Sequence, residues 1–240
     1  MAHLTGQARS HYVQQMFARI ARRYDVMNRL MTFGQDLKWR RYVIQQAHLP
    51  TGGKLLDIAT GTGDIAYEGQ RQRPDIQAVG GDFCIEMMAM GQRYPERQTL
   101  QWVGADALAL PFPHGLFDAI TSGFLLRNVI DLPAALREQV RVTRPGGYIV
   151  ALDSSPPKRN WLRPFILFHL NYVIPFLGWL VTGEADAYRY LPSSTQKFIG
   201  PEALADEMRA AGLVDVGYRL FMFGTIGVHF GRKPLPSSPE

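Results

Sequence analysis

A short apolar run that ends in closely spaced glycines constrains the fold of this chain more than any other feature. The run is Lys54–Asp64, KLLDIATGTGD, in which apolar residues surround Asp57 and the triplet Gly61-Thr62-Gly63 follows at once. Such a run is typical of a buried parallel strand, and two glycines spaced by one residue let a ligand approach the backbone closely. Helical sequence comes next. The stretch therefore has the order strand, glycine turn and helix that a nucleotide site requires.

Strand-like runs alternate with helical patterns through the rest of the chain. After the first strand, the predicted strands are Ile76–Asp82, Leu100–Asp106, Phe117–Phe124 and Tyr148–Asp153, and the helices between them are Ile85–Tyr94 and Leu132–Thr143. This alternation predicts a doubly wound α/β fold with a parallel sheet. A last helix, Pro201–Ala211, precedes the runs Val214–Phe221 and Thr225–Gly231, which predict a closing antiparallel hairpin.

The chain is predicted to form a single domain over residues 1–233. Its parts are an N-terminal helical cap at 9–49, a core at 54–155 and 200–233, an apolar helical insertion at 158–195, and a disordered, Pro- and Ser-rich tail at 234–240. In the cap, a second helix starts near Asp36. The stretch Tyr24–Arg40 is unusually rich in aromatic, Met and polar residues together.

The insertion contains the run Trp161–Val181, which is long enough to span a bilayer. Arg163, His169, Asn171 and two prolines interrupt it, which disfavours a transmembrane helix. A buried helix that covers the sheet is the favoured interpretation. An amphipathic surface that lies on a membrane or admits a lipid-like substrate is the alternative.

Composition leaves several partners open and disfavours others. The net charge of +5 suits an anionic membrane face, an anionic cofactor or an unspecialised surface. No RNA-binding module accompanies it, so we expect no nucleic-acid partner. The single cysteine, Cys84, excludes an internal disulfide and fits a reducing compartment. With no secretory signal pattern, the predicted location is cytoplasmic, with peripheral contact at the inner face of the membrane. No cluster has metal-ligand spacing, and we expect no metal.

Three acids are predicted to lie at or near strand ends, and they limit the chemical classes of ligand that the site can bind. Asp57 lies inside the first strand, Asp82 ends the second and Asp106 ends the third. Asp82 follows the glycine turn at the distance where an acid can hold ribose hydroxyls. The turn lacks the third glycine of a dinucleotide fingerprint, and three carboxylates are poor neighbours for phosphates. They suit a ligand that combines a ribose with a positive centre.

S-adenosyl-L-methionine has both features. DIATGTGD, followed by GDF and GAD at the next strand ends, resembles motif I of the class I methyltransferases. More narrowly, the chain is similar to the UbiE/COQ5 family, the C-methyltransferases of menaquinone and ubiquinone biosynthesis. The blocks that carry this resemblance are Met16–Arg40, Leu125–Val129, Arg137–Gly147, Tyr188–Ser194 and Gly227–Lys233. The resemblance implies a Rossmann-like, seven-stranded, mostly parallel sheet with helices on both faces.

The resemblance also implies roles for individual residues toward the cofactor. Thr62 and the backbone of Gly61 and Gly63 would face its methionine part, and Asp82 would hold its ribose. The remaining residues of the predicted cofactor site are Asp57, Phe83, Asp106 and Ala107 (the last two beside the adenine), and Gly123 on the floor. Asp and Gly are also common in ordinary turns, so each has a purely structural alternative.

The reaction that the resemblance implies is C-methylation of a polyprenylated quinol, with demethylmenaquinol as the expected acceptor. Arg127 would stabilise the phenolate, Asn128 would orient the ring hydroxyl or a water, and Asp25 is a second candidate for proton handling. Each of these residues also has a structural alternative. Arg127 could pair with an acid on a neighbouring helix, Asn128 could cap a turn, and Asp25 could be an ordinary helix N-cap. A benzoquinol, another aromatic or lipid acceptor, and a non-catalytic cofactor-binding protein remain alternatives.

The chain departs from the family pattern in two segments near the expected acceptor. Gly123 replaces a serine and Leu125 a glycine in the family's SFGLRNV, and LEFSKP appears as LDSSPP, in which Asp153 shortens the acid by one methylene. These changes bear on the identity of the acceptor more than on that of the cofactor.

Overall fold

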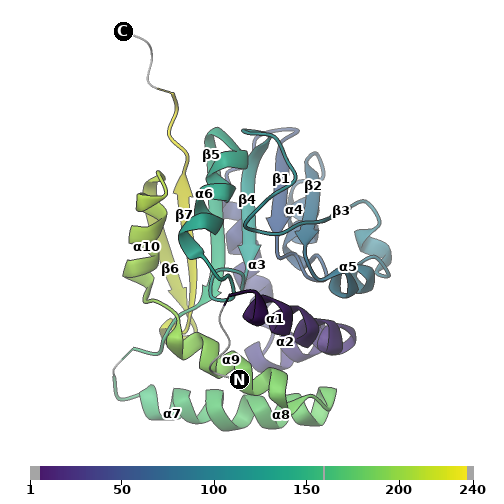
Figure 1. The fold of residues 1–240 in the computed structure, drawn as a ribbon, viewed down its shortest axis with the longest axis vertical. Coiled ribbons are helices and arrows are strands. Elements are labelled where there is room, and N and C mark those ends of the chain that lie inside the picture. Colours follow the sequence, from purple (N-terminus) through teal and green to yellow (C-terminus); the bar gives the residue numbers. More distant parts are fainter. Residues whose placement is uncertain (1–5, 159, 237–240) are drawn as a thin grey trace.

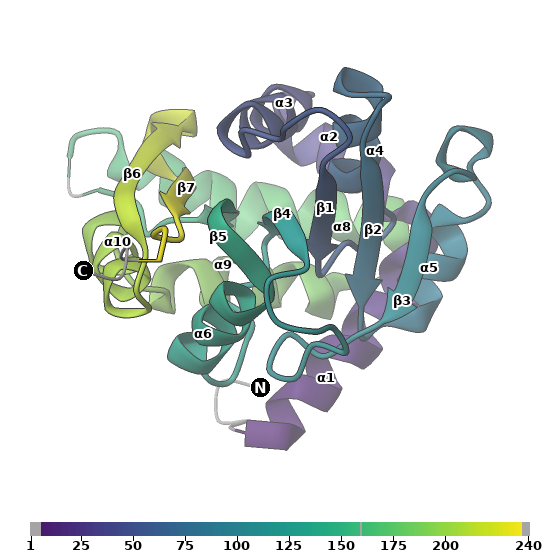
Figure 2. The same cartoon turned by 90° about the horizontal axis from the view of Figure 1, so that it is seen from above.

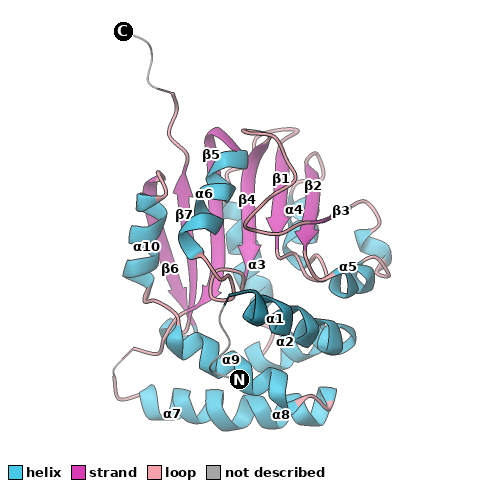
Figure 3. Cartoon of the chain, viewed as in Figure 1, coloured by secondary structure: helices cyan, strands magenta, loops and turns pink. Residues whose placement is uncertain are grey.

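Seven strands form one mixed sheet in a computed structural model that describes residues 6–158 and 160–236. The strand order is β3-β2-β1-β4-β5-β7-β6, and β7 alone runs antiparallel to its neighbours (Figure 3). The strands are β1 Lys54–Ile58, β2 Gln77–Asp82, β3 Gln101–Gly104, β4 Phe117–Gly123, β5 Thr143–Ser154, β6 Val214–Phe221 and β7 Ile226–Arg232. The predicted parallel sheet with a closing antiparallel hairpin is confirmed.

Helices cover both faces of the sheet and its lower end. They are α1 Gly6–Ile20, α2 Tyr24–Thr32, α3 Asp36–Gln46, α4 Asp64–Gln72, α5 Ile85–Gly91, α6 Leu132–Val142, α7 Arg163–Phe168, α8 Ile174–Thr182, α9 Ala185–Lys197 and α10 Pro201–Ala210. Figure 2 shows α3 and α4 on one face and α6 and α10 on the other. A hydrophobic core lies on each face of the sheet, and alternate residues of β1 point into one or the other. Leu55 packs in the core on the α3 side and Leu56 in the core on the α6 side.

The carboxyl ends of the parallel strands face a layer made of α1, α2 and α7–α9 (Figure 1). β1 and β4 are neighbours at the centre of the sheet, where the strand order reverses. In open α/β sheets, ligands bind outside the carboxyl ends of the strands at this switch point. The fold therefore places the residues after β1, β2 and β4 at the edge where a site is expected.

Two boundaries differ from the sequence prediction. The stretch Tyr24–Arg40 contains a complete helix, α2, in addition to the start of α3. Strand β5 starts at Thr143, ahead of the predicted start at Tyr148, because Thr143 already pairs with Phe117 across a register shift. The predicted tail at 234–240 falls largely on residues 237–240, which lie outside the described residues.

The apolar insertion does not cover the sheet, and the favoured interpretation of it was wrong. Residues 163–182 form a continuous helix, α7 to α8, through a π-helical turn at His169–Val173. Its length and composition would suffice to cross a membrane, and only 17% of its most apolar stretch is buried. The faces of the sheet are already occupied by α3, α4, α6 and α10. The helix therefore lies across the end of the molecule, where Gly178 packs closely against the ring of Tyr188 on α9.

Substitution of Gly91 tests how tightly α5 packs on the glycine turn. A Cβ at Gly91 would lie 2.2 Å from the carbonyl oxygen of Thr62 and 2.6 Å from the Trp102 ring. We expect Gly91→Ala to lower the free energy of unfolding by about 1–3 kcal/mol in urea denaturation. Gly104→Ala is the control, because its added Cβ makes only an ordinary contact with Ile85. Equal effects of the two substitutions would contradict this packing.

Candidate active site

Two cavities lie between the strand ends and the helical layer. The first, which we call the strand-end cavity, has a volume of about 300 Å³ and lies where β1, β2 and β4 end. The second, the cap cavity, has a volume of about 330 Å³ and lies among α1–α3 and α7–α9. The predicted cofactor residues that line the strand-end cavity are Gly61, Asp82, Phe83, Asp106, Ala107 and Gly123. The cap cavity contains Arg127 and Asn128 in its lining.

Asp82 holds the glycine turn and still has capacity to bind a ligand. Its carboxylate accepts hydrogen bonds from the backbone N–H of Gly61, at 2.7 Å, and of Cys84, at 2.8 Å. A carboxylate has about four acceptor positions, so positions remain for two hydroxyls from the cavity. Burial raises the pKa of Asp82, while the backbone N–H groups act to lower it. This geometry fits a ribose, whose hydroxyls would donate to the charged form.

Two residues of the strand-end cavity have a left-handed backbone although they are not glycines. Ala59, with φ of 54°, follows β1, and Phe124, with φ of 60°, follows β4. Both line the cavity. Such conformations cost of order 1 kcal/mol or more and cluster at functional sites. Neither residue was predicted from the sequence, because nothing in an Ala or Phe marks a positive φ.

Three predicted cofactor residues lie outside the lining of the strand-end cavity. Thr62 is 2% exposed, and its hydroxyl donates to Asp25. Gly63 is the N-cap of α4, where a Cβ would meet the Trp102 ring at 2.5 Å. Asp57 is buried within β1. Thr62 and Gly63 therefore belong to the glycine turn, and Asp57 to the strand that precedes it, on the side away from the cavity.

The Asp57 carboxyl is held by two hydroxyls in the centre of the sheet. Thr60 donates to it at 2.7 Å and Thr121 at 2.8 Å. Burial raises its pKa from the ordinary value of 3.8 to about 7, against the lowering effect of those hydrogen bonds. Asp57 therefore gains and loses its proton near neutral pH.

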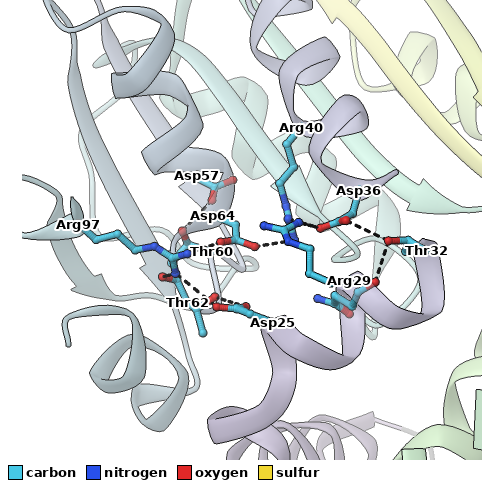
Figure 4. A network of polar contacts seen from close by, with 11 residues as sticks. Asp25, Arg29, Thr32, Asp36, Arg40, Asp57, Thr60, Thr62, Asp64 and Arg97 are labelled. Carbon is cyan, nitrogen blue, oxygen red and sulfur yellow. Dashed lines mark hydrogen bonds and ion pairs between the residues drawn. The ribbon is translucent and has the colours of Figure 1, made fainter. Parts of the chain in front are cut away.

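A network of ion pairs joins the N-terminal cap to the glycine turn (Figure 4). Arg97, 6% exposed, donates to the carbonyl oxygen of Thr62 at 2.5 Å and pairs with Asp64 at the start of α4. It also lies 3.6 Å from the carboxylate of Asp25 on α2. The Thr62 hydroxyl donates to the same Asp25 carboxylate at 2.8 Å. Asp25 thus connects α2 to the glycine turn. It is not the N-cap of α2, because that position is Arg23.

The network continues into α3. Arg40, 6% exposed, pairs with Asp64 at 2.7 Å and with Asp36 at 2.5 Å. Asp36 also pairs with Arg29 and accepts a hydrogen bond from Thr32, both on α2. Each buried charge in this chain of contacts faces an opposite charge, as burial requires. Arg97, Arg40 and Asp64 were missed in the sequence analysis, since no local pattern links residues so far apart.

Arg127 lies in a buried ion pair beside the cap cavity. Its guanidinium is 2.6 Å from Asp153, at the end of β5, and its backbone N–H donates to the same carboxylate at 3.1 Å. The guanidinium also lies over the Phe124 ring, 4.7 Å from its centre. The Nε of Arg127 is buried and makes no hydrogen bond within the described residues. The partner of Arg127 is thus on a strand and not on a neighbouring helix.

Asn128 belongs to the wall that both cavities share. The residues that line both are Phe17, Tyr24, Phe124 and Asn128. The Asn128 side chain donates to the carbonyl oxygen of Phe124 at 2.9 Å and accepts a hydrogen bond from the hydroxyl of Tyr190 at 3.0 Å. Burial raises the pKa of Tyr24, so its hydroxyl keeps its proton. The two cavities are therefore adjacent.

The donor set of the site favours an organic ligand. In the part of the chain that the structure describes, no group of three or more His, Cys, Asp or Glu side chains is placed to hold a metal ion. Cys84 lines the strand-end cavity, and burial raises the pKa of its thiol to about 12, which disfavours a thiolate nucleophile.

This sheet and the position of its site define the class I fold of S-adenosylmethionine-dependent methyltransferases. Solved structures with this fold include phosphoethanolamine N-methyltransferase 2 from Haemonchus contortus, with a TM-score of 0.61 and 14% identity over 82% of this chain and 52% of that one. A possible histamine N-methyltransferase from Thermotoga maritima has a TM-score of 0.64 and 18% identity over 92% of this chain and 99% of that one.

Sequence comparison identifies the family. The model of the ubiE/COQ5 methyltransferase family matches residues 5–233, and the chain belongs to this family. A ubiquinone/menaquinone biosynthesis C-methyltransferase of Desulfotalea psychrophila is 48% identical over 92% of this chain and 90% of its own length. A demethylmenaquinone methyltransferase of Thermus thermophilus is 44% identical over 91% of this chain and its whole length. The family resemblance found in the sequence is confirmed.

The raised pKa of Asp57 predicts a pH-dependent stability. The folded state binds this proton more tightly than the unfolded state, so the contribution of Asp57 is most favourable below pH 4 and is lost as the pH rises through about 7. Between pH 4 and 8, wild type should lose roughly 4 kcal/mol of unfolding free energy relative to Asp57→Asn in urea denaturation. Asp75→Asn is the control, because the pKa of exposed Asp75 is lowered to about 2. Parallel curves for wild type and Asp57→Asn would contradict the assignment.

Proposed function

We propose that this chain transfers a methyl group from S-adenosyl-L-methionine to a ring carbon of demethylmenaquinol. The observation that carries the proposal is the pair of cavities that share one wall, in a member of a family whose named relatives include demethylmenaquinone methyltransferases. The strand-end cavity holds the carboxylates of Asp82 and Asp106 among mostly apolar side chains, and the cap cavity is still more apolar. One suits a charged nucleoside and the other a prenylated aromatic ring.

The proposed cofactor residues surround the strand-end cavity. Asp82 would accept the ribose hydroxyls while it holds the Gly61 N–H. Asp106, Ala107 and Phe83 would border the adenine. The cofactor would supply an electrophilic methyl group on a sulfonium, and the carboxylates favour its positive charge. Thr62, Gly63 and Asp57 would support the glycine turn and would not contact the cofactor directly. Gly123 would form the floor of the strand-end cavity.

The proposed acceptor residues lie on the side of the cap cavity. A quinol that loses a phenolic proton gains electron density on the ring carbon ortho to that oxygen. The Arg127–Asp153 pair has no net charge, so Arg127 would stabilise the phenolate by a hydrogen bond from its unpartnered Nε. Asn128, oriented by Tyr190, would position the ring hydroxyl or a water that takes the proton. Asp25 is assigned the attachment of α2, since it lies outside the lining of both cavities.

We further propose that the enzyme works at the cytoplasmic face of a membrane, where a polyprenylated quinol resides. The mostly apolar lining of the cap cavity supports this location. A benzoquinol is the alternative acceptor, because the name of the Desulfotalea psychrophila relative covers both quinones.

Transfer of label tests the proposed reaction. Purified protein, methyl-labelled S-adenosylmethionine and reduced quinols in detergent should give labelled menaquinol from demethylmenaquinol. Benzoquinol with a matched prenyl tail is the comparison acceptor. Faster transfer to the benzoquinol would show that a benzoquinol, and not demethylmenaquinol, is the preferred acceptor. Cofactor binding without transfer to any quinol would refute the proposed reaction.

The ribose assignment of Asp82 predicts a loss of cofactor affinity. Asp82→Ala removes the acceptor and releases the Gly61 N–H, so the Kd for S-adenosylhomocysteine should rise tenfold or more, roughly, in calorimetry. Asp215→Ala is the control, because this exposed acid pairs with Arg232 at the opposite end of the sheet. Unchanged affinity in Asp82→Ala would refute the assignment.

The phenolate assignment of Arg127 predicts a loss of turnover without a loss of cofactor. Arg127→Gln should lower kcat by about 100-fold and leave the Kd for S-adenosylhomocysteine within about twofold. This variant leaves Asp153 buried and unpaired, so the double variant Arg127→Gln/Asp153→Asn should recover stability and not turnover. If the double variant recovers both, Arg127 acts only through folding.

A further inference from the structure

The helix from α7 to α8 presents a line of aromatic side chains to the outside. We call these residues the aromatic stripe: Trp161, Phe165, Phe168, Tyr172, Phe176 and Trp179. Their exposed fractions run from 55% to 77%. They recur at three- and four-residue spacing, which places them along one side of a helix. Single exposed apolar residues are normal, but a continuous row of large rings marks an interaction surface.

Basic residues flank the amino end of the stripe. Residues 154–183 contain no Asp or Glu, and Lys158 and Arg163 are among their basic residues; Glu184, which comes next, pairs with Arg19 on α1 at 3.3 Å. Arg163 begins α7 and is exposed, as is Lys158, whose side chain runs beside Gly224 in the loop between β6 and β7. Exposed Trp and Tyr with flanking basic residues are the composition that anchors proteins at a lipid–water interface. An anionic bilayer is complementary to this surface in both polarity and charge.

The stripe meets the opening of the cap cavity. Phe165 belongs to the stripe and also lines the cavity. Phe33 and Phe223, 79% and 72% exposed, line the same cavity from the end of α2 and from the loop between β6 and β7. Both have a left-handed backbone, with φ of 51° and 55°, which is costly for a bulky side chain. Three exposed rings from separate elements thus form an apolar rim.

We propose that the aromatic stripe and this rim are the face by which the protein lies on an anionic lipid bilayer. The α7–α8 helix lies parallel to the membrane plane, and the cap cavity opens toward the acyl chains. The inner side of the helix is already occupied, since Leu170 and Ile174 are buried and Gly178 packs on Tyr188. The helix therefore lies on the membrane and does not cross it. The proposal depends on the proposed function in one respect only, the identity of the prenylated quinol as the lipid that enters the cap cavity.

Vesicle binding of a variant with two acidic substitutions tests the surface. Phe168→Glu/Trp179→Glu changes two stripe residues that lie outside the lining of both cavities. Wild type should co-sediment with vesicles of phosphatidylglycerol and phosphatidylcholine more strongly than with phosphatidylcholine alone. The double variant should lose binding by roughly tenfold or more. Val214→Glu is the matched control, because Val214 is an exposed apolar residue at the amino end of β6, away from the stripe, and it should bind like wild type.

Other results would overturn the proposal. Wild type that stays in solution with every vesicle, or a double variant that binds like wild type, contradicts it. A wild-type dimer that the double variant converts to monomer, with vesicle binding unchanged, would assign the stripe to a second copy. Resistance of vesicle-bound protein to carbonate extraction would indicate a spanning helix. Methyl transfer to a short-tailed, water-soluble naphthoquinol should be equal in wild type and variant. If transfer fails in both while vesicle binding follows the prediction, the proposed function fails alone.

Discussion

The ion pairs between Arg97, Asp64 and Arg40 are the contacts on which the site depends. They join helices of the N-terminal cap to the turn after β1, and these charges are largely withdrawn from water. Loss of one partner would leave a buried charge unpaired, at a cost of about 3–5 kcal/mol. The same network holds α2 through Asp25, which lies 3.6 Å from Arg97, and through Arg29, which pairs with Asp36. Helix α2 carries Tyr24 into the lining of both cavities. The cap is thus a component of the site and not a separate cover.

A site divided by a shared wall explains how one chain can bring unlike reactants together. The strand-end cavity, with the carboxylates of Asp82 and Asp106, lies between the strand ends and α1, and the more apolar cap cavity lies among the helices. Phe124 and Asn128 lie between them, on the loop that follows β4. Methyl transfer needs alignment of two bound reactants more than it needs a strong acid or base. The strained backbone at Phe124 and the hydrogen bonds of Asn128 supply fixed geometry at that point.

The sequence was most informative where local pattern determines structure. Alternating strands and helices predicted the sheet, and the acids at the ends of the predicted strands placed Asp82 and Asp106 at its edge. Family blocks suggested Arg127 and Asn128 as site residues, although not their partners Asp153 and Tyr190. The insertion was misjudged because hydropathy alone does not say whether an apolar helix faces the core or the outside; that depends on the sheet faces already filled. Arg97 and the left-handed Ala59 leave no sequence signal, because both follow from tertiary packing.

The central claim is that cofactor and acceptor occupy the two cavities on either side of the shared wall. A crystal structure with S-adenosylhomocysteine and a short-tailed naphthoquinol would test it most directly. The account predicts the ribose on Asp82 and the quinol ring beside Arg127 and Asn128, with the methyl group in direct line with the ring carbon where Tyr24 and Phe124 border both cavities. A ring bound outside the cap cavity, or a ribose away from Asp82, would contradict it.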